Sequence, residues 1–159
     1  MKRETLFLKM TLVIMALPIL ALCIFVVPQI AEFFAELAPN WAFLRYPFLA
    51  GLYAAALIYF AALYQTMKLL TYIDKDTAFS EASVSVLKNI KLCAVLIGTL
   101  FVLFMPLIFL MGDADDAPGI VVIGMGIIFG CVVIAVFAAV LQKLLHNAID
   151  IKSENDLTV

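Results

Sequence analysis

The chain has 159 residues, of which 66% are hydrophobic and only 14% are charged. Soluble domains are about 45–50% apolar, and a chain this small has too much surface for its volume to hide the excess from water. The net charge of −2 and the scattered basic residues also argue against direct nucleic-acid binding. The composition therefore predicts an integral membrane protein with the lipid bilayer as its surroundings.

Four uncharged runs follow one another along the chain, and each is long enough to cross a bilayer. They occupy residues 10–31, 46–67, 92–112 and 119–142. We therefore expect an all-α fold: a single membrane domain over residues 1–159, built as a four-helix bundle. The first run is too long for a signal peptide and lacks a clean cleavage site, so it predicts a retained span. Prolines inside the runs predict kinks at Pro18, Pro28 and Pro106.

Small residues in two of the runs predict close helix packing. Gly51 and Ala55 have the small-xxx-small spacing that lets helix backbones approach. Gly126 and Gly130 form a G-x-x-x-G pattern, which predicts packing within the bundle and leaves dimerisation open as the alternative. Hydroxyls within the second run predict hydrogen bonds between helices, from Tyr53, Tyr59 and Tyr64.

Three polar segments separate or follow the runs. In the first loop, residues 31–46, the pattern predicts a short interfacial helix that ends near Pro39. Residues 74–91 form a connector whose apolar positions recur at helical spacing, with Thr77 or Ser80 as the helix cap. We expect this connector to be an amphipathic helix lying at the membrane surface and leading into the third span. The segment 143–159 predicts about two further helical turns and then a polar tail.

Basic residues predict the orientation. Nine of the ten lie before the first span, around the connector or after the fourth span, and Arg45 is alone on the other side. By the positive-inside rule, both termini, the connector and the tail are cytoplasmic. The acidic turn at residues 113–116 is then outside.

The spans contain no Asp, Glu, Lys, Arg or His. Ion-coupled transporters and proton relays place such residues in the membrane, and hydrolases need a nucleophile with a base or a metal. Neither the cysteines nor the single histidine, His146, has the spacing of a metal site. The sequence therefore predicts no catalytic residue, no cofactor and no metal.

Two segments resemble a known family. The connector DKDTAFSEASVSVLKNIK and the tail HNAIDIKSENDLTV are similar to the YoaS-like family, four-span bacterial membrane proteins of unknown function. Ala78 and Ala82 depart from residues common in that family. The resemblance implies a place in the bacterial cytoplasmic membrane. It also implies a signalling partnership with a small helix-turn-helix regulator, because the neighbouring gene commonly encodes one.

The first functional hypothesis is a membrane sensor or anchor for such a regulator. Its docking surface would lie in the connector and the tail, whose last residues suit strand addition or capture in a groove. The residues proposed for it are Phe79, Lys88, Asp156, Leu157, Thr158 and Val159. The alternatives are an export or immunity protein for small molecules or peptides, and a structural subunit of a membrane complex. A homo-oligomer stays open in each case.

Overall fold

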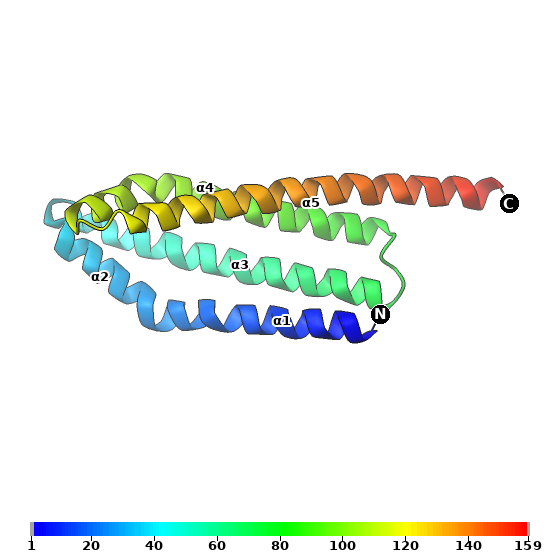
Figure 1. Ribbon diagram of the computed structural model, residues 1–159, viewed down its shortest axis with the longest axis horizontal. Helices are drawn as coiled ribbons and strands as arrows, with labels where there is room; N and C mark the ends of the chain where they lie inside the picture. Colours follow the sequence, from blue (N-terminus) through cyan, green and yellow to red (C-terminus); the bar gives the residue numbers. More distant parts are fainter. Residues whose placement is uncertain (1, 159) are drawn as a thin grey trace.

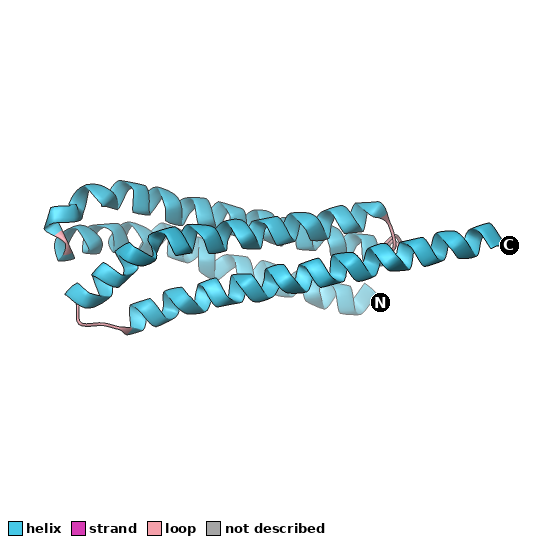
Figure 2. Ribbon diagram, turned by 90° about the horizontal axis from the view of Figure 1, so that it is seen from above, coloured by secondary structure: helices cyan, strands magenta, loops and turns pink. Residues whose placement is uncertain are grey.

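The computed structural model describes residues 2–158, with side chains as far as Leu157. Four long helical rods lie side by side and are joined by short loops (Figure 1, Figure 2). Each rod is long and apolar enough to cross a membrane: Lys2–Leu37, Pro39–Asp74, Glu81–Ala114 and Gly119–Leu157. The all-α, four-span prediction is confirmed.

The first rod is bent where Pro28 interrupts the hydrogen-bond ladder. It consists of α1 (Lys2–Ala21), the π-helical turn η1 (Leu22–Val26) and α2 (Val27–Leu37). Proline has no N–H to donate and its ring crowds the preceding turn, so the helix widens just before it. Figure 1 shows α2 turning away from the line of α1 at this point. Pro18, by contrast, lies inside α1 without ending it.

The second rod begins directly after the first. A helix ends before Pro39 as predicted, because Ala38 has left the helical region with φ −129° and ψ 72°. That helix is α2, which continues the first rod and is not a separate short helix of the loop. The 3₁₀ turn η2 (Pro39–Leu44) then leads into α3 (Arg45–Asp74). A buried cluster gathers at this end of the bundle, where the rings of Phe34 and Phe48 are 5.8 Å apart and those of Phe48 and Phe104 are 5.4 Å apart.

The third and fourth rods are α4 (Glu81–Ala114) and α5 (Gly119–Thr158). Helices α3 and α4 end in the same way, with Asp76 and Asp116 in the left-handed region at φ 58° and 52°. After each, the next N–H closes the turn: Thr77 donates to the carbonyl of Tyr72 and Ala117 to that of Gly112, both at 2.8 Å. These Schellman caps satisfy the last carbonyls and reverse the chain within a few residues.

The connector differs from the prediction. A loop covers residues 75–80, and α4 then runs from Glu81 through the third span as one helix, so no separate helix lies along the surface. No proline stands between Glu81 and Pro106. Of the predicted apolar stripe, Val86 is only 2% exposed and packs inside the bundle, whereas Phe79 and Ala82 are exposed. Ser80 is the N-cap, because its hydroxyl accepts a hydrogen bond from the N–H of Ser83 at 3.4 Å.

Each rod packs mainly on the rod that is next to it in the sequence. Helix α1 packs on α3, α3 on α4, and α4 on α5, while α2 packs on α3. Helices α1 and α5 are therefore the outer members of the row. This leaves one side of α1 and one side of α5 uncovered by the rest of the chain.

The predicted small-residue contacts divide into two groups. Gly51 is buried where an added Cβ would overlap the ring of Phe104, and Ala55 is only 7% exposed. Gly126 and Gly130 behave differently, because no atom of the described residues lies within 4 Å of an added Cβ at either. The prediction that this pair packs within the bundle was wrong. Its spacing indicates a smooth helix face, but not which way that face points.

Candidate functional site

Most of the charged residues of the protein, and nine of the ten basic ones, lie at one end of the bundle. The N-terminus, the loop at residues 75–80 and the C-terminal part of α5 all lie there, and α5 projects past the others (Figure 1, Figure 2). We call this the basic end. The basic residues on the helix portions nearest to it are Lys2, Arg3, Lys9, Lys68, Lys75, Lys88, Lys91, Lys143 and Lys152.

A polar clasp joins α1 to α3 at the basic end. The Nζ of Lys9 lies 2.8 Å from Oδ2 of Asp74, and the hydroxyl of Thr5 donates to Oδ1 of the same carboxylate. Thr5 is itself only 4% exposed. The side-chain hydrogen bonds from Lys9 and then from Thr5 hold the pKa of Asp74 below its ordinary value. Asp74 is therefore an ionised anchor for the first turns of α1.

A second polar set joins the start of α4 to α5. His146 Nδ1 lies 4.0 Å from a carboxylate oxygen of Glu81, and its Nε2 lies 3.8 Å from Asp150 on the next turn of α5. Farther from the basic end along the same two helices, Lys91 donates to the amide oxygen of Gln142 at 3.4 Å. These contacts hold α5 against α4 where the uncharged run of α5 ends. Among the described residues, no three His, Cys, Asp or Glu side chains form a group that could hold a metal.

Two tyrosines of α3 bind backbone carbonyls of the first rod. The hydroxyl of Tyr53 donates to the carbonyl of Cys23 at 3.0 Å, and that of Tyr59 to the carbonyl of Met15 at 3.3 Å. In η1 the N–H of Val27 bonds to the carbonyl of Leu22, so the next donor in that register would be residue 28. Residue 28 is proline, and Tyr53 supplies the donor that Cys23 lacks. The predicted hydrogen bonds between helices are confirmed at these two tyrosines.

The predicted docking residues are spread along the basic end. Phe79 is in the loop and 58% exposed, and Lys88 is exposed on α4. Asp156 and Leu157 lie at the tip of α5, beyond that loop, with Leu157 83% exposed. The structure therefore does not bring the two groups together.

The tail is also helical beyond the two turns that were predicted, because α5 continues to Thr158. Helical residues do not offer the free backbone groups that strand addition needs. Val159 lies outside the described residues.

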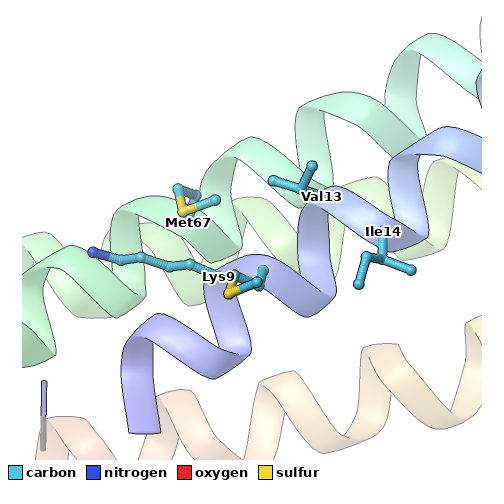
Figure 3. A pocket seen from close by; sticks show the side chains of 5 residues that line it. Lys9, Val13, Ile14 and Met67 are labelled. Carbon is cyan, nitrogen blue, oxygen red and sulfur yellow. The ribbon is translucent and has the colours of Figure 1, made fainter. Parts of the chain in front are cut away.

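Two open grooves lie along the rods, and both are apolar. One lies between α1 and α3, with a volume of about 320 Å³, and Figure 3 shows the amine of Lys9 directed away from Val13 and Ile14. The other, also about 320 Å³, lies between α4 and α5 beside Gly98 and Cys131. Neither brings together the polar groups that a reaction would need, so the polar groups of interest are those of the basic end.

Comparison with known proteins places the chain in a family. The family described as "Protein of unknown function (DUF2975)" matches residues 29–159. The chain belongs to this family. It is also 59% identical over 158 residues to "Uncharacterized membrane protein YoaS" of Bacillus subtilis (strain 168), with 99% of each chain covered. No solved structure matches the chain.

These matches confirm the YoaS-like resemblance. Together with the four apolar rods, they identify a small multi-pass membrane protein.

Proposed function

We propose that the protein is a membrane sensor or anchor that holds a regulatory protein at the cytoplasmic face. In this proposal the basic end is cytoplasmic, as nine of ten basic residues favour, and the role is not catalytic. The main support for this proposal is the extension of α5 beyond its uncharged span. From Lys143 to Thr158 the helix runs about 24 Å past the uncharged span. Its tip presents an 83% exposed Leu157 to water.

The tip of α5 suits a protein partner that accepts a helix in a groove. Leu157 supplies an apolar anchor, and three acidic side chains surround it on the last turns: Asp150, Glu154 and Asp156. A DNA-binding regulator carries basic surface, so its charge is complementary to this tip. The family resemblance favours a helix-turn-helix protein as that regulator. Phe79 and Lys88 offer a second contact nearer the membrane.

The test is co-purification from native membranes with three variants. The first lacks residues 156–159, the second is Phe79→Ala, and the third is the control Phe43→Ala. Phe43 is 64% exposed in η2, at the opposite end of the bundle. We expect a DNA-binding protein to co-purify with the parent chain and with the control, and to be lost or much reduced with the first two. Expression of the genes that this regulator controls should change in the same two variants.

Two results would contradict the regulator hypothesis. Identical co-purifying proteins and unchanged transcription in all variants would refute the regulator hypothesis. Loss of a membrane-embedded partner instead would favour a structural subunit. The amount of each variant in the membrane is measured first, so that misfolding is not mistaken for loss of binding.

A further inference from the structure

One flank of α5 is apolar along most of its length and is only partly covered by the rest of the chain. The neighbouring face of the helix lies on α4, where an added Cβ at Gly124 would be 3.1 Å from Sδ of Met105, and where Ala138 is 4% exposed. On the flank itself, Phe137 is 64% exposed and Ile151 is 63% exposed.

The small and apolar residues of this flank repeat with alternating steps of three and four. Steps of this kind place residues on one narrow stripe of a helix, as in a two-stranded coiled coil. We call this stripe the α5 seam, and its members are Ile127, Gly130, Ile134, Phe137, Leu141, Leu144, Ala148 and Ile151. Apart from its own chain neighbours and helix backbone, nothing in the described residues comes within 4 Å of an added Cβ at Gly130. Four members are more than half exposed, namely Ile134, Phe137, Leu144 and Ile151, and the other four are partly covered. The seam is therefore regular and in part open.

The seam crosses the end of the hydrophobic span without changing face. The uncharged run of α5 ends at Gln142, and Lys143 follows. Lipid accounts for exposed apolar side chains before this point. It does not account for Leu144, 59% exposed, or for Ile151, because both lie on the part of the helix that continues among charged residues. A water-soluble partner, conversely, reaches only that outer part.

We propose that the α5 seam binds the α5 seam of a second copy of this chain, in parallel. A second copy in the same orientation presents every seam residue at the same membrane depth, so one interface covers both the lipid and the water portions. The contact is then isologous, with its two-fold axis along the membrane normal. Gly130 allows the backbones to approach within the bilayer, and Leu144 and Ile151 interlock beyond it.

This dimer leaves the proposed regulator surface free. Leu157 is six residues beyond Ile151, which places it about 120° around the helix at 100° per residue. Phe79 belongs to the loop before α4 and is not part of the seam. The dimer and the regulator contact can therefore succeed or fail independently.

The first test is disulfide cross-linking in native membranes, in a chain whose three cysteines are replaced by alanine. Single cysteines are placed on the seam in Ile134→Cys, Leu144→Cys and Ile151→Cys. Controls off the seam are Val136→Cys, in the span and 58% exposed, and Ser153→Cys, in the exposed extension. A disulfide needs Cβ atoms about 3.5–4.5 Å apart, so we expect dimers from the three seam positions and little from the controls.

The second test is the mass of the purified protein in lipid nanodiscs, with no other protein present. We expect twice the 17.5 kDa of one chain for the parent and for the control Ser153→Glu. The double variant Leu144→Glu/Ile151→Glu should have half of that mass, as expected of a monomer. Both of its substitutions lie beyond the uncharged run, so they leave insertion of the span intact.

Several results would overturn the proposal. Equal cross-linking on and off the seam would indicate random collision, and cross-linking at Leu144 and Ile151 but not Ile134 would show that the seam does not continue into the bilayer. A monomeric parent chain, or a double variant that stays dimeric, would exclude the interface directly.

Discussion

Replacing Tyr53 by phenylalanine removes one hydroxyl and leaves the ring in place. In the structure that hydroxyl donates to the carbonyl of Cys23 at 3.0 Å, in the widened turn before Pro28. Hydrogen bonds between membrane helices contribute about 0.6 kcal/mol on average and about 1.7 at most. The carbonyl of Cys23 has no helical donor to return to, so we expect Tyr53→Phe to cost about 1–1.7 kcal/mol, the upper part of this range.

The cause of this cost can be isolated with a second substitution. Pro28→Ala restores an N–H that can reach the carbonyl of Cys23 or that of Ile24. The hydroxyl of Tyr53 then becomes dispensable, and Tyr53→Phe should cost close to nothing in the Pro28→Ala background. The double-mutant cycle should therefore show a coupling free energy equal to the whole cost of Tyr53→Phe, about 1–1.7 kcal/mol, between two residues on different helices.

Reversible unfolding in mixed detergent and SDS micelles measures each free energy. Tyr64→Phe is the matched control on the same helix, because Tyr64 is 63% exposed and its ring faces Lys68. An equal cost of Tyr53→Phe with and without Pro28 would refute the reasoning. It would mean that the hydroxyl stabilises the helix pair without regard to the missing donor.

Three further predictions follow from the packing, the clasp and the orientation. Gly51→Leu forces a side chain into a neighbouring ring and should destabilise the fold by about 1–3 kcal/mol, whereas Gly126→Leu should leave the melting of a detergent-held monomer unchanged. Because the pKa of Asp74 is lowered in the folded protein, its carboxylate stabilises the fold at pH values above the ordinary carboxyl pKa, and this effect is lost as the pH falls through the lower folded pKa. Asp74→Asn should therefore make the free energy of unfolding less dependent on pH on the acid side. Finally, a cysteine at the exposed Ser85 should resist a membrane-impermeant thiol reagent in intact cells, and one at Ala114 should react; labelling of Ser85 would reverse the proposed orientation.

The four spans were predictable because lipid demands long uncharged runs, and this signal is read directly from the chain. The ends of the helices were not, because hydropathy marks contact with lipid and not the helix itself. Helix α5 continues among charged residues to Thr158, and α3 continues until Asp74, where the clasp with Lys9 holds its last turn. Both helices are longer than their uncharged runs.

The contacts between helices depend on register, which one sequence does not reveal. Tyrosines in a span predict hydrogen bonds, but the pairing of Tyr53 with Cys23 requires knowing how far α3 slides along the first rod. Likewise, Glu81 and His146 are far apart in the sequence and meet only because α4 and α5 run antiparallel. The helical spacing of the connector was recognised correctly, but only its part from Val86 onward packs in the bundle, while Phe79 and Ala82 are exposed.

The order in which the helices pack also bears on how the chain is assembled. Since each helix lies on the one made just before it, every new rod finds its neighbour already in the bilayer as synthesis proceeds. No early segment has to wait for a distant later one, and such local pairing is the kind that forms quickly. Helix α5, the last to emerge, contacts mainly α4, so the row of the first three rods does not need α5 in order to form its own contacts.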